Sequence, residues 1–194
     1  MKAPLIKNNF FIITGGPGAG KSSVLDQLYK SGYEVVPEVA RQIIKDQLAL
    51  GGNAIHSGDQ VAFRDLMLEY SIDDFNKHSD NQNITFFDRG IPELLGYSNL
   101  ISQPPKSTLL AAMKQYRYNS HVFLFPPWEE IYVHDVERKQ DFEEAVVTYH
   151  FIKQAYIDSE YKLIEMPKTS ILSRTQFIIA HINRICDKLN NAIR

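Results

Sequence analysis

Short apolar runs alternate along the chain with longer segments in which apolar residues recur at helical spacing. The runs have the length of buried strands and end at glycine, proline or polar residues. They are Phe10 to Ile13, Tyr33 to Val36, Ile84 to Phe87, His121 to Phe125 and Tyr161 to Glu165. Strands that alternate with helices predict an α/β fold, a five-stranded parallel sheet with helices on both faces. Ligands of such sheets bind beyond the carboxyl ends of the strands, so we expect the loops there to share one cleft.

The segments between the runs are predicted to be helices because their apolar residues recur three or four positions apart. The last segment is the most regular, with Ile178, Ile182, Ile185 and Leu189 in one stripe. The others are predicted before Gly32, from Glu38 to Gly51, around Phe63 to Tyr70, after Pro92, from Thr108 to Tyr118 and from Phe142 to Ile157. No repeat, low-complexity tract or linker interrupts this pattern, so we interpret residues 1–194 as a single domain.

The residues after the first run carry the pattern of a phosphate-binding loop. Gly15, Gly20, Lys21 and Ser22 satisfy G-x-x-x-x-G-K-[ST], with a predicted strand before the pattern and a predicted helix after it. Glycines allow positive φ and bring backbone N–H groups close to a polyphosphate. The residues predicted to bind the nucleotide are Gly15, Gly16, Pro17, Gly18, Ala19, Gly20, Lys21, Ser22 and Ser23.

Lys21, Ser22 and Asp88 are predicted to act on the bound phosphates. Lys21 would reach the β- and γ-phosphates, and the Ser22 hydroxyl would hold Mg²⁺ at the start of a helix. Asp88 follows the third run, from which a carboxylate can reach the same Mg²⁺ or accept a substrate proton. The alternative for Asp88 is a helix cap, but the phosphate loop favours a functional role. ATP and Mg²⁺ are therefore the expected cofactors.

Arg89 and Glu38 are two further candidates for catalytic roles. Arg89 stands where many ATP-hydrolysing motors carry a second carboxylate, and its guanidinium suits phosphate oxygens. This favours transfer to a bound acceptor over hydrolysis. Glu38 follows the second run, where a carboxylate could hold an acceptor hydroxyl, or Mg²⁺ indirectly. An equally supported alternative is a first-turn residue that the helix dipole favours and that pairs with Arg41.

The charged segment from Trp128 to Asp141 lies between a predicted strand and a predicted helix, where many small-molecule kinases have a lid. We interpret residues 128–141 as a short lid from which Arg138 would close over the γ-phosphate and exclude water. A solvated loop of mixed charge is the alternative. Trp128 could stack on a planar base, although packing against the protein is the favoured interpretation.

The charge balance excludes several classes of partner. The 194 residues include 21 basic and 23 acidic ones, and this net charge of -2 gives no overall attraction to nucleic acid or to an anionic membrane. The single cysteine, Cys186, excludes an internal disulfide and is predicted to pack in the core. No apolar stretch approaches the ~20 residues of a spanning helix, and the first run is no signal peptide, so we expect a cytoplasmic protein.

Five sequence blocks together resemble the stand-alone AAA-type ATPase domain family akin to the nicotinamide riboside kinase domain. They are ITGGPGAGKS at 13–22, VPEVAR at 36–41, FFDRG at 86–90, FPPWEEIY at 125–132 and ERKQDFEEA at 137–145. The resemblance implies a P-loop fold of the nucleoside and nucleotide kinase type, ATP with Mg²⁺, and functional roles for Lys21, Ser22 and Asp88. It leaves the substrate open.

Two functions remain as expectations. The first is a kinase that transfers the γ-phosphoryl group of ATP to a hydroxyl of a small, nucleoside-like acceptor. The second is a regulatory binding module that responds to ATP or GTP and hydrolyses it slowly. Arg89 and the predicted lid favour the kinase, in which the catalytic residues would be Lys21, Asp88, Glu38, Arg89 and Arg138.

Overall fold

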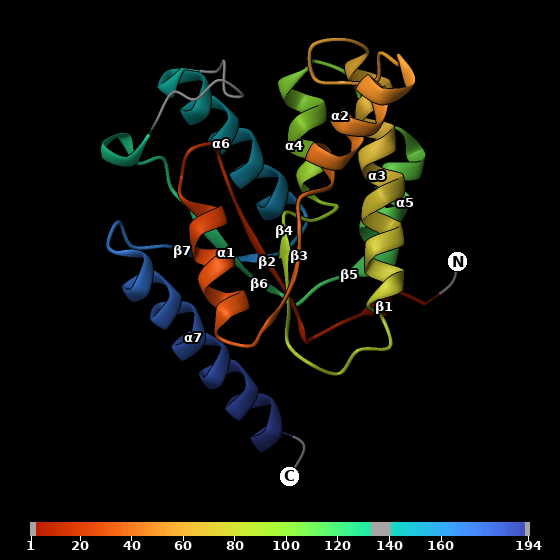
Figure 1. The fold of residues 1–194 in the computed structure, drawn as a ribbon. Helices are drawn as coiled ribbons and strands as arrows, with labels where there is room; N and C mark the ends of the chain where they lie inside the picture. Colours follow the sequence, from red (N-terminus) through yellow and green to blue (C-terminus); the bar gives the residue numbers. More distant parts are fainter. Residues whose placement is uncertain (1–2, 133–140, 193–194) are drawn as a thin grey trace.

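The predicted five-stranded parallel sheet is present in the computed structural model, which describes residues 3–132 and 141–192 (Figure 1). The strand order is β3-β4-β2-β6-β7, and every pair in this sheet is parallel. The strands are β2 Phe10–Gly15, β3 Glu34–Val36, β4 Thr85–Asp88, β6 His121–Phe125 and β7 Lys162–Glu165. Each matches a predicted run, because a continuously apolar run of this length suits a strand that is covered on both faces.

Seven α-helices in the described part of the chain cover both faces of the sheet, as predicted (Figure 1). Helices α1 and α7 share one apolar cluster with one face, and residues of α2 to α6 share a second cluster with the other. The helices are α1 Lys21–Lys30, α2 Val39–Leu50, α3 Gln60–Lys77, α4 Glu93–Leu100, α5 Ser107–Gln115, α6 Phe142–Asp158 and α7 Ile171–Ala192.

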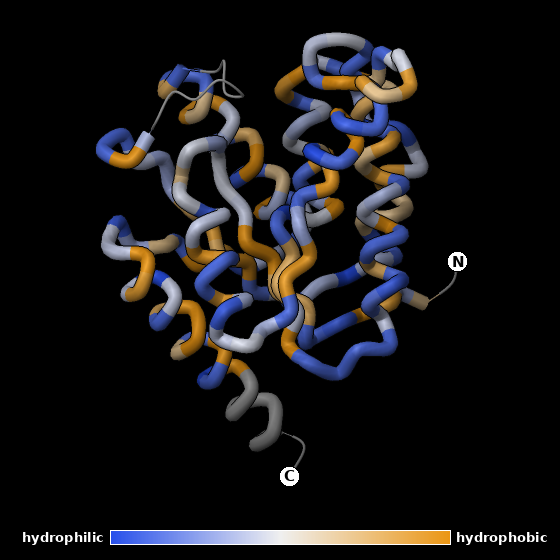
Figure 2. Tube along the Cα trace, viewed as in Figure 1, coloured by the Kyte–Doolittle hydropathy of each residue, from blue (hydrophilic) through white to orange (hydrophobic). Residues whose placement is uncertain are grey.

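The central strand β2 shows how the two clusters arise from one apolar run. Phe10 and Ile12 point into the cluster beneath α2 to α6, whereas Phe11 and Ile13 point into the cluster beneath α1 and α7. Successive side chains of a strand face opposite sides, so an unbroken apolar run fills both layers. All four side chains are 0% exposed. The apolar positions in Figure 2 accordingly concentrate along the central strands.

One predicted helix ends earlier than expected, and the predicted lid is described only in part. The helix predicted from Thr108 to Tyr118 is wrong at its end: α5 stops at Gln115, and the next two residues form β5, Tyr116–Arg117, which pairs with β1, Leu5–Ile6. A two-residue strand carries no readable alternation, so its pairing was not predictable from the pattern. In the predicted lid, the chain forms a short 3-10 helix at Glu129–Ile131, and residues 133–140, with Arg138, lie outside the described residues.

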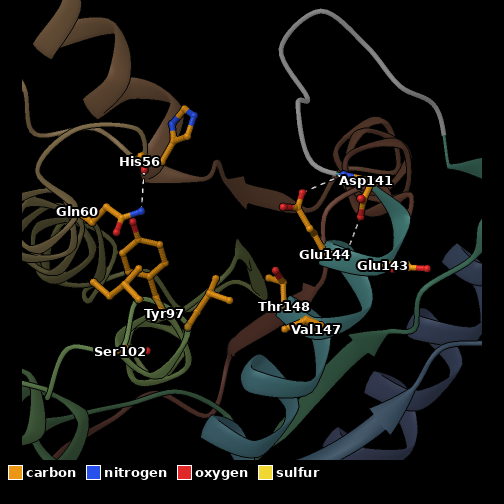
Figure 3. A pocket seen from close by; sticks show the side chains of 11 residues that line it. His56, Gln60, Tyr97, Ser102, Asp141, Glu143, Glu144, Val147 and Thr148 are labelled. Carbon is orange, nitrogen blue, oxygen red and sulfur yellow. Dashed lines mark hydrogen bonds between the residues drawn. The ribbon is translucent and has the colours of Figure 1, made fainter.

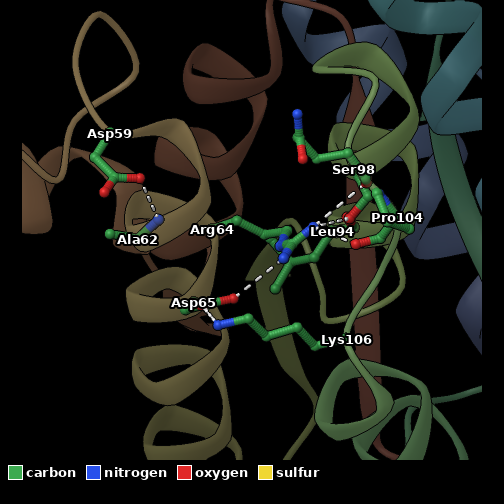
Figure 4. A network of polar contacts seen from close by, with 9 residues as sticks. Asp59, Ala62, Arg64, Asp65, Leu94, Ser98, Pro104 and Lys106 are labelled. Carbon is green, nitrogen blue, oxygen red and sulfur yellow. Dashed lines mark hydrogen bonds and ion pairs between the residues drawn. The ribbon is translucent and has the colours of Figure 1, made fainter.

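A buried arginine joins α3 to α4 (Figure 4). Arg64 is 2% exposed, and its Nη1 donates hydrogen bonds to Ser98 Oγ and to the Pro104 carbonyl, each at 3.1 Å. Its Nη2 lies 3.4 Å from Asp65, which also pairs with Lys106 at the surface. Because a buried cation must be solvated by fixed partners, this network holds the two helices in one relative position.

Replacing Arg64 by methionine is therefore expected to lower the free energy of unfolding by about 2–4 kcal/mol, through lost hydrogen bonds and buried acceptors left unpaired. Urea denaturation followed by circular dichroism measures the effect. Lys106→Met is the matched control, because its side chain is 55% exposed and a surface ion pair contributes below about 1 kcal/mol. Equal losses for the two variants would refute a structural role for the Arg64 network.

Candidate active site

The phosphate-loop sequence connects β2 to α1 at the carboxyl edge of the sheet. Gly15, Gly18 and Gly20 have φ values of 140°, 73° and 79°, a region of φ that L side chains rarely adopt. A Cβ at Gly15 would also lie 2.3 Å from the Phe125 carbonyl oxygen of β6. The glycine at this position therefore serves both the backbone turn and the close approach of the neighbouring strand.

Lys21 begins α1 and folds its side chain back over the loop. Its Nζ donates to the carbonyl oxygens of Gly15 and Gly16, both at 2.9 Å, and the residue is 7% exposed. Ser22 and Ser23 follow in the first turn of α1 and are exposed. The ammonium group is thus confined to the loop, where it can reach a phosphate without a large search of side-chain conformations.

A cleft of about 1030 Å³ gathers most of the predicted catalytic residues. Lys21 and Ser22 line it from α1, Glu38 lines it from the end of β3, and Asp88 and Arg89 line it from the end of β4. Strands β3, β4 and β2 are neighbours, so these positions meet because parallel strands end at the same edge. Arg138 cannot be placed, since it lies outside the described residues.

Arg89 is held between two carboxylates. Its Nε donates to Glu38 Oε1 at 2.6 Å, and its Nη1 donates to Glu93 and to the Gly15 carbonyl oxygen. Glu93 is 7% exposed and accepts a second hydrogen bond, of 2.5 Å, from Thr14 Oγ1. The Arg89 guanidinium therefore contacts protein carboxylates beside the first loop glycine, and its predicted contact with phosphate oxygens stays a prediction.

The pKa values of Glu38 and Asp88 are shifted in opposite directions from their usual values. Burial acts to raise the pKa of Glu38, but the charges of Arg89 and Lys21 outweigh it and hold this pKa below its usual value. Burial raises the pKa of Asp88, and Lys21 offsets only part of this rise. Glu38 is thus the carboxylate that the local charges keep ionised.

Asp88 has an oxygen free to take a cation. Its Oδ1 is buried and has no hydrogen-bond partner among the described residues. A buried carboxylate oxygen is costly unless it is paired, and the exposed Ser22 hydroxyl lines the same cleft. Oxygen donors of this kind suit Mg²⁺, which is usually held by one or two protein side chains and by substrate phosphates. The arrangement fits the predicted metal pair of Ser22 and Asp88.

Glu38 also makes the contact that the alternative interpretation predicted. Its Oε2 lies 3.8 Å from Arg41 Nε, three residues further along α2, but the contact with Arg89 is shorter, at 2.6 Å. Glu38 occupies the N-cap position of α2 and makes no side-chain capping bond. The stronger partner of Glu38 therefore comes from the residue after the neighbouring strand β4 and not from α2.

Aromatic side chains form the far wall of the cleft. The rings of Phe63 and Tyr97 meet edge to face with centroids 6.1 Å apart, and His56 lies against Phe63. An adjoining cavity of about 640 Å³ shares Tyr97 and Thr148 with the cleft and lies between α4 and the start of α6 (Figure 3). The Tyr97 and Thr148 hydroxyls are buried and have no partner among the described residues. This end of the cleft can bind a flat ring that carries a polar edge.

Three residues at the site were missed in the sequence. Glu93 and Tyr97 lie on α4 and look like ordinary helix residues, although Glu93 follows Arg89 by one helical turn. Arg174, in the first turn of α7, donates to the Ala19 carbonyl of the loop, 155 residues away, and no local pattern announces such a contact. Trp128 packs against this arginine, as the favoured interpretation expected.

The described residues hold neither a cluster of typical metal ligands nor a membrane-spanning helix. Histidine, cysteine and carboxylate side chains nowhere gather in threes around a possible metal position in the described part of the chain. Among the helices at 3–132 and 141–192, none combines the length and the apolar character needed to cross a membrane. The side chain of Cys186 falls outside the described residues, so its predicted packing stays a prediction.

Comparisons with known proteins agree with this architecture. NadR in complex with NR superposes with a TM-score of 0.66 at 16% identity, over 90% of this chain and 50% of that one. Thymidylate kinase from Ehrlichia chaffeensis gives 0.62 at 15%, over 92% and 100% of the two chains. Deoxyadenosine kinase from M. mycoides gives 0.58 at 15%, over 91% and 99%. These TM-scores show that the chain has the fold of these kinases, and at identities this low the likeness shows the fold alone.

Among curated proteins, no match to this sequence was found. The sequence does match one family model. Residues 10–174 match the model described as AAA domain, a span that runs from the first residue of β2 to Arg174. It includes the phosphate loop, both candidate carboxylates and the aromatic wall. The chain belongs to the AAA domain family.

Proposed function

We propose that this protein is a small-molecule kinase that transfers the γ-phosphoryl group of ATP to a hydroxyl of a nucleoside-like acceptor. The observation that carries the proposal is the meeting of Lys21, Asp88 and Glu38 in one cleft that continues to an aromatic wall. The cleft joins a loop suited to phosphates to a region suited to a flat ring. The name of one structural neighbour, deoxyadenosine kinase, agrees with a nucleoside as the acceptor, and that of another, thymidylate kinase, agrees with an acceptor of the related nucleotide class.

Each residue has a defined part in the proposed transfer. The loop N–H groups and Lys21 hold the β- and γ-phosphates, and Ser22 and Asp88 hold Mg²⁺, which neutralises charge on the phosphate oxygens when it is bound. The acceptor oxygen forms a bond to the γ-phosphorus while the bond from that phosphorus to the β–γ bridging oxygen breaks, and ADP leaves. Glu38, kept ionised by Arg89, accepts the proton of the acceptor hydroxyl.

The hydrogen bonds around Arg89 support this assignment of the base. Arg89 contacts Glu38 and Glu93 together, and Glu93 is fixed by Thr14 at the end of β2. The network aligns Glu38 with respect to the first glycine of the loop, so the proton acceptor and the phosphate cradle share one rigid support. The predicted role of Arg138 in charge compensation and water exclusion belongs to the same proposal.

Acceptor-stimulated release of ADP tests the proposed function. Nucleosides, nucleotides and vitamins with a primary hydroxyl are added singly to the protein with ATP and Mg²⁺, and ADP is followed by a coupled assay. We expect at least one nucleoside-like compound to raise the rate of ADP release. Mass spectrometry should then show a product that is heavier than this compound by one phosphoryl group. If no compound raises this rate, and exchange of the bound nucleotide instead changes the affinity for a partner protein, the proposal of a kinase is replaced by that of a regulatory binding module.

Replacement of Tyr97 by phenylalanine is expected to raise the KM for the acceptor about 2- to 10-fold and to leave the KM for ATP unchanged, because one neutral hydrogen bond to the acceptor is lost. The free energy of unfolding should not fall, since the hydroxyl is buried without a partner among the described residues. Tyr70→Phe is the control, because the Tyr70 hydroxyl donates to Asp46 at 3.2 Å and Tyr70 does not line the cleft. An unchanged acceptor KM in Tyr97→Phe excludes this hydroxyl from the acceptor site.

A further inference from the structure

A buried arginine from the far end of the chain lies against the phosphate loop. Arg174 is 4% exposed, and its Nη1 donates to the Ala19 carbonyl oxygen at 3.2 Å. A Cβ at Gly20 would lie 2.8 Å from the same Nη1 and 3.1 Å from Nη2. The guanidinium therefore contacts the backbone of the loop directly, and the absence of a side chain at Gly20 gives it room.

Two aromatic rings hold Arg174 in this position. Its Cζ lies 5.7 Å from the centroid of the Phe125 ring, at the end of β6, and 5.3 Å from that of Trp128. Such cation–π contacts fix a guanidinium without neutralising its charge. Trp128 is the one tryptophan of the sequence, so its fluorescence reports on this position alone.

The charge of Arg174 is not balanced by the described protein. No carboxylate in the described residues forms an ion pair with it, and its Nε is buried without a hydrogen-bond partner. Burial lowers the pKa of Arg174, and no charge among the described residues offsets this. A buried unpaired cation destabilises a fold, and its cost is removed when an anion binds nearby. The nearest structure suited to an anion is the phosphate loop itself.

We propose that Arg174 is a positioning residue of the phosphate loop, which orients the peptide between Ala19 and Gly20 and places behind the loop a positive charge that the nucleotide phosphates neutralise. This inference rests on the nucleotide binding that the proposed function requires. In a trans peptide the C=O and the following N–H point in opposite directions. Because Arg174 fixes the Ala19 C=O, the Gly20 N–H points away from α7, and Gly20 lines the cleft.

The proposal distinguishes a charge effect from simple support of the loop. A purely structural contact would weaken all nucleotides by the same factor. A positive charge behind the loop instead acts more strongly on ATP than on ADP, because the triphosphate carries more negative charge. The two roles therefore predict different ratios of ATP to ADP affinity in the same variant.

Isothermal titration calorimetry of the full chain with Mg²⁺ measures these affinities for ATP and ADP. Arg174→Gln is expected to weaken ATP binding about 10- to 100-fold and ADP binding by a smaller factor, as expected for the loss of a charge-assisted contact. Arg174→Lys retains the charge and should recover the wild-type ratio of the two affinities, although not the full affinity. In the wild type, ATP binding is also expected to change the emission of Trp128.

Arg117→Gln is the matched control. The Arg117 guanidinium also lies over an aromatic ring, that of Tyr161 at 4.3 Å, and also donates to a backbone carbonyl, that of Ser159, but it belongs to β5 and does not line the cleft. Its nucleotide affinities should be those of the wild type. Equal losses of ATP and ADP affinity in Arg174→Gln, or no loss, overturn the proposal.

The outcome is separable from that of the proposed function. Weakened ATP binding in Arg174→Gln together with no acceptor-stimulated ADP release would retain the positioning role and reject the kinase. Acceptor-stimulated release with unchanged affinities in Arg174→Gln would retain the kinase and reject the positioning role. If Arg174→Gln does not fold, Arg174→Met takes its place, since it also removes the charge and keeps an apolar stem: a larger loss of affinity for ATP than for ADP supports the proposal, and equal losses contradict it.

Discussion

Asp88→Asn is expected to lower acceptor-dependent turnover about 100- to 1000-fold while ATP still binds, because asparagine keeps the shape of the side chain and loses the charge that Mg²⁺ requires. Oδ1 of Asp88 is buried and has no hydrogen-bond partner among the described residues. Lys21 and the loop N–H groups, which hold the phosphates in the proposed mechanism, are unchanged in this variant. The loss therefore falls on the chemical step and only slightly on nucleotide affinity.

Turnover is measured with the acceptor found in the panel, and ATP affinity is measured by calorimetry on the same preparation. Asp26→Asn is the control with the same chemical change, because Asp26 forms an exposed ion pair with Lys30 on the outer side of α1. Its turnover should equal that of the wild type. Full activity in Asp88→Asn would remove Asp88 from the mechanism.

Lys21→Ala is expected to weaken ATP binding about 10- to 100-fold, since a charged group that donates to phosphate oxygens is lost. The fold should persist. Alanine is favourable in the first turn of a helix, and α1 keeps its buried residues Val24, Leu25 and Leu28 in this variant. The melting temperature should therefore change by no more than a few degrees.

Calorimetric titration with ATP and Mg²⁺ measures the affinity, and circular dichroism measures the melting temperature. Lys30→Ala removes a lysine from the last turn of the same helix, where Lys30 forms an exposed ion pair with Asp26, and serves as the control. The contradicting result is an ATP affinity in Lys21→Ala that equals that of Lys30→Ala on folded protein.

The sequence pattern predicted those features that depend on neighbours along the chain. The strand β6 has the predicted bounds, and α2 ends where Gly51 adopts a left-handed conformation, because apolar runs and helix-ending glycines act locally. The position of Asp88 beside the loop was also predictable, since the carboxyl ends of adjacent parallel strands must meet.

The remaining features depend on contacts that no local pattern encodes. The pairing of Leu5–Ile6 with Tyr116–Arg117 joins two segments too short to show alternation. The partners of Arg89 depend on the turn between β4 and α4, where Arg89 itself has a φ of 76°. Residue type alone predicts that such an arginine contacts phosphate. In the fold, however, Arg89 Nε lies 2.6 Å from Glu38 Oε1.

The complete burial of β2 has a consequence for how the loop moves. The phosphate loop follows directly on β2, in which the side chains of Phe10 to Ile13 are fully buried. Strand β2 also has a paired strand on each side. Such a segment opens only with the whole domain, whereas helices at the rim open locally at much lower free energy. Entry and exit of ligands are then governed by the surrounding helices, and the root of the loop stays fixed as an anchor throughout a catalytic cycle.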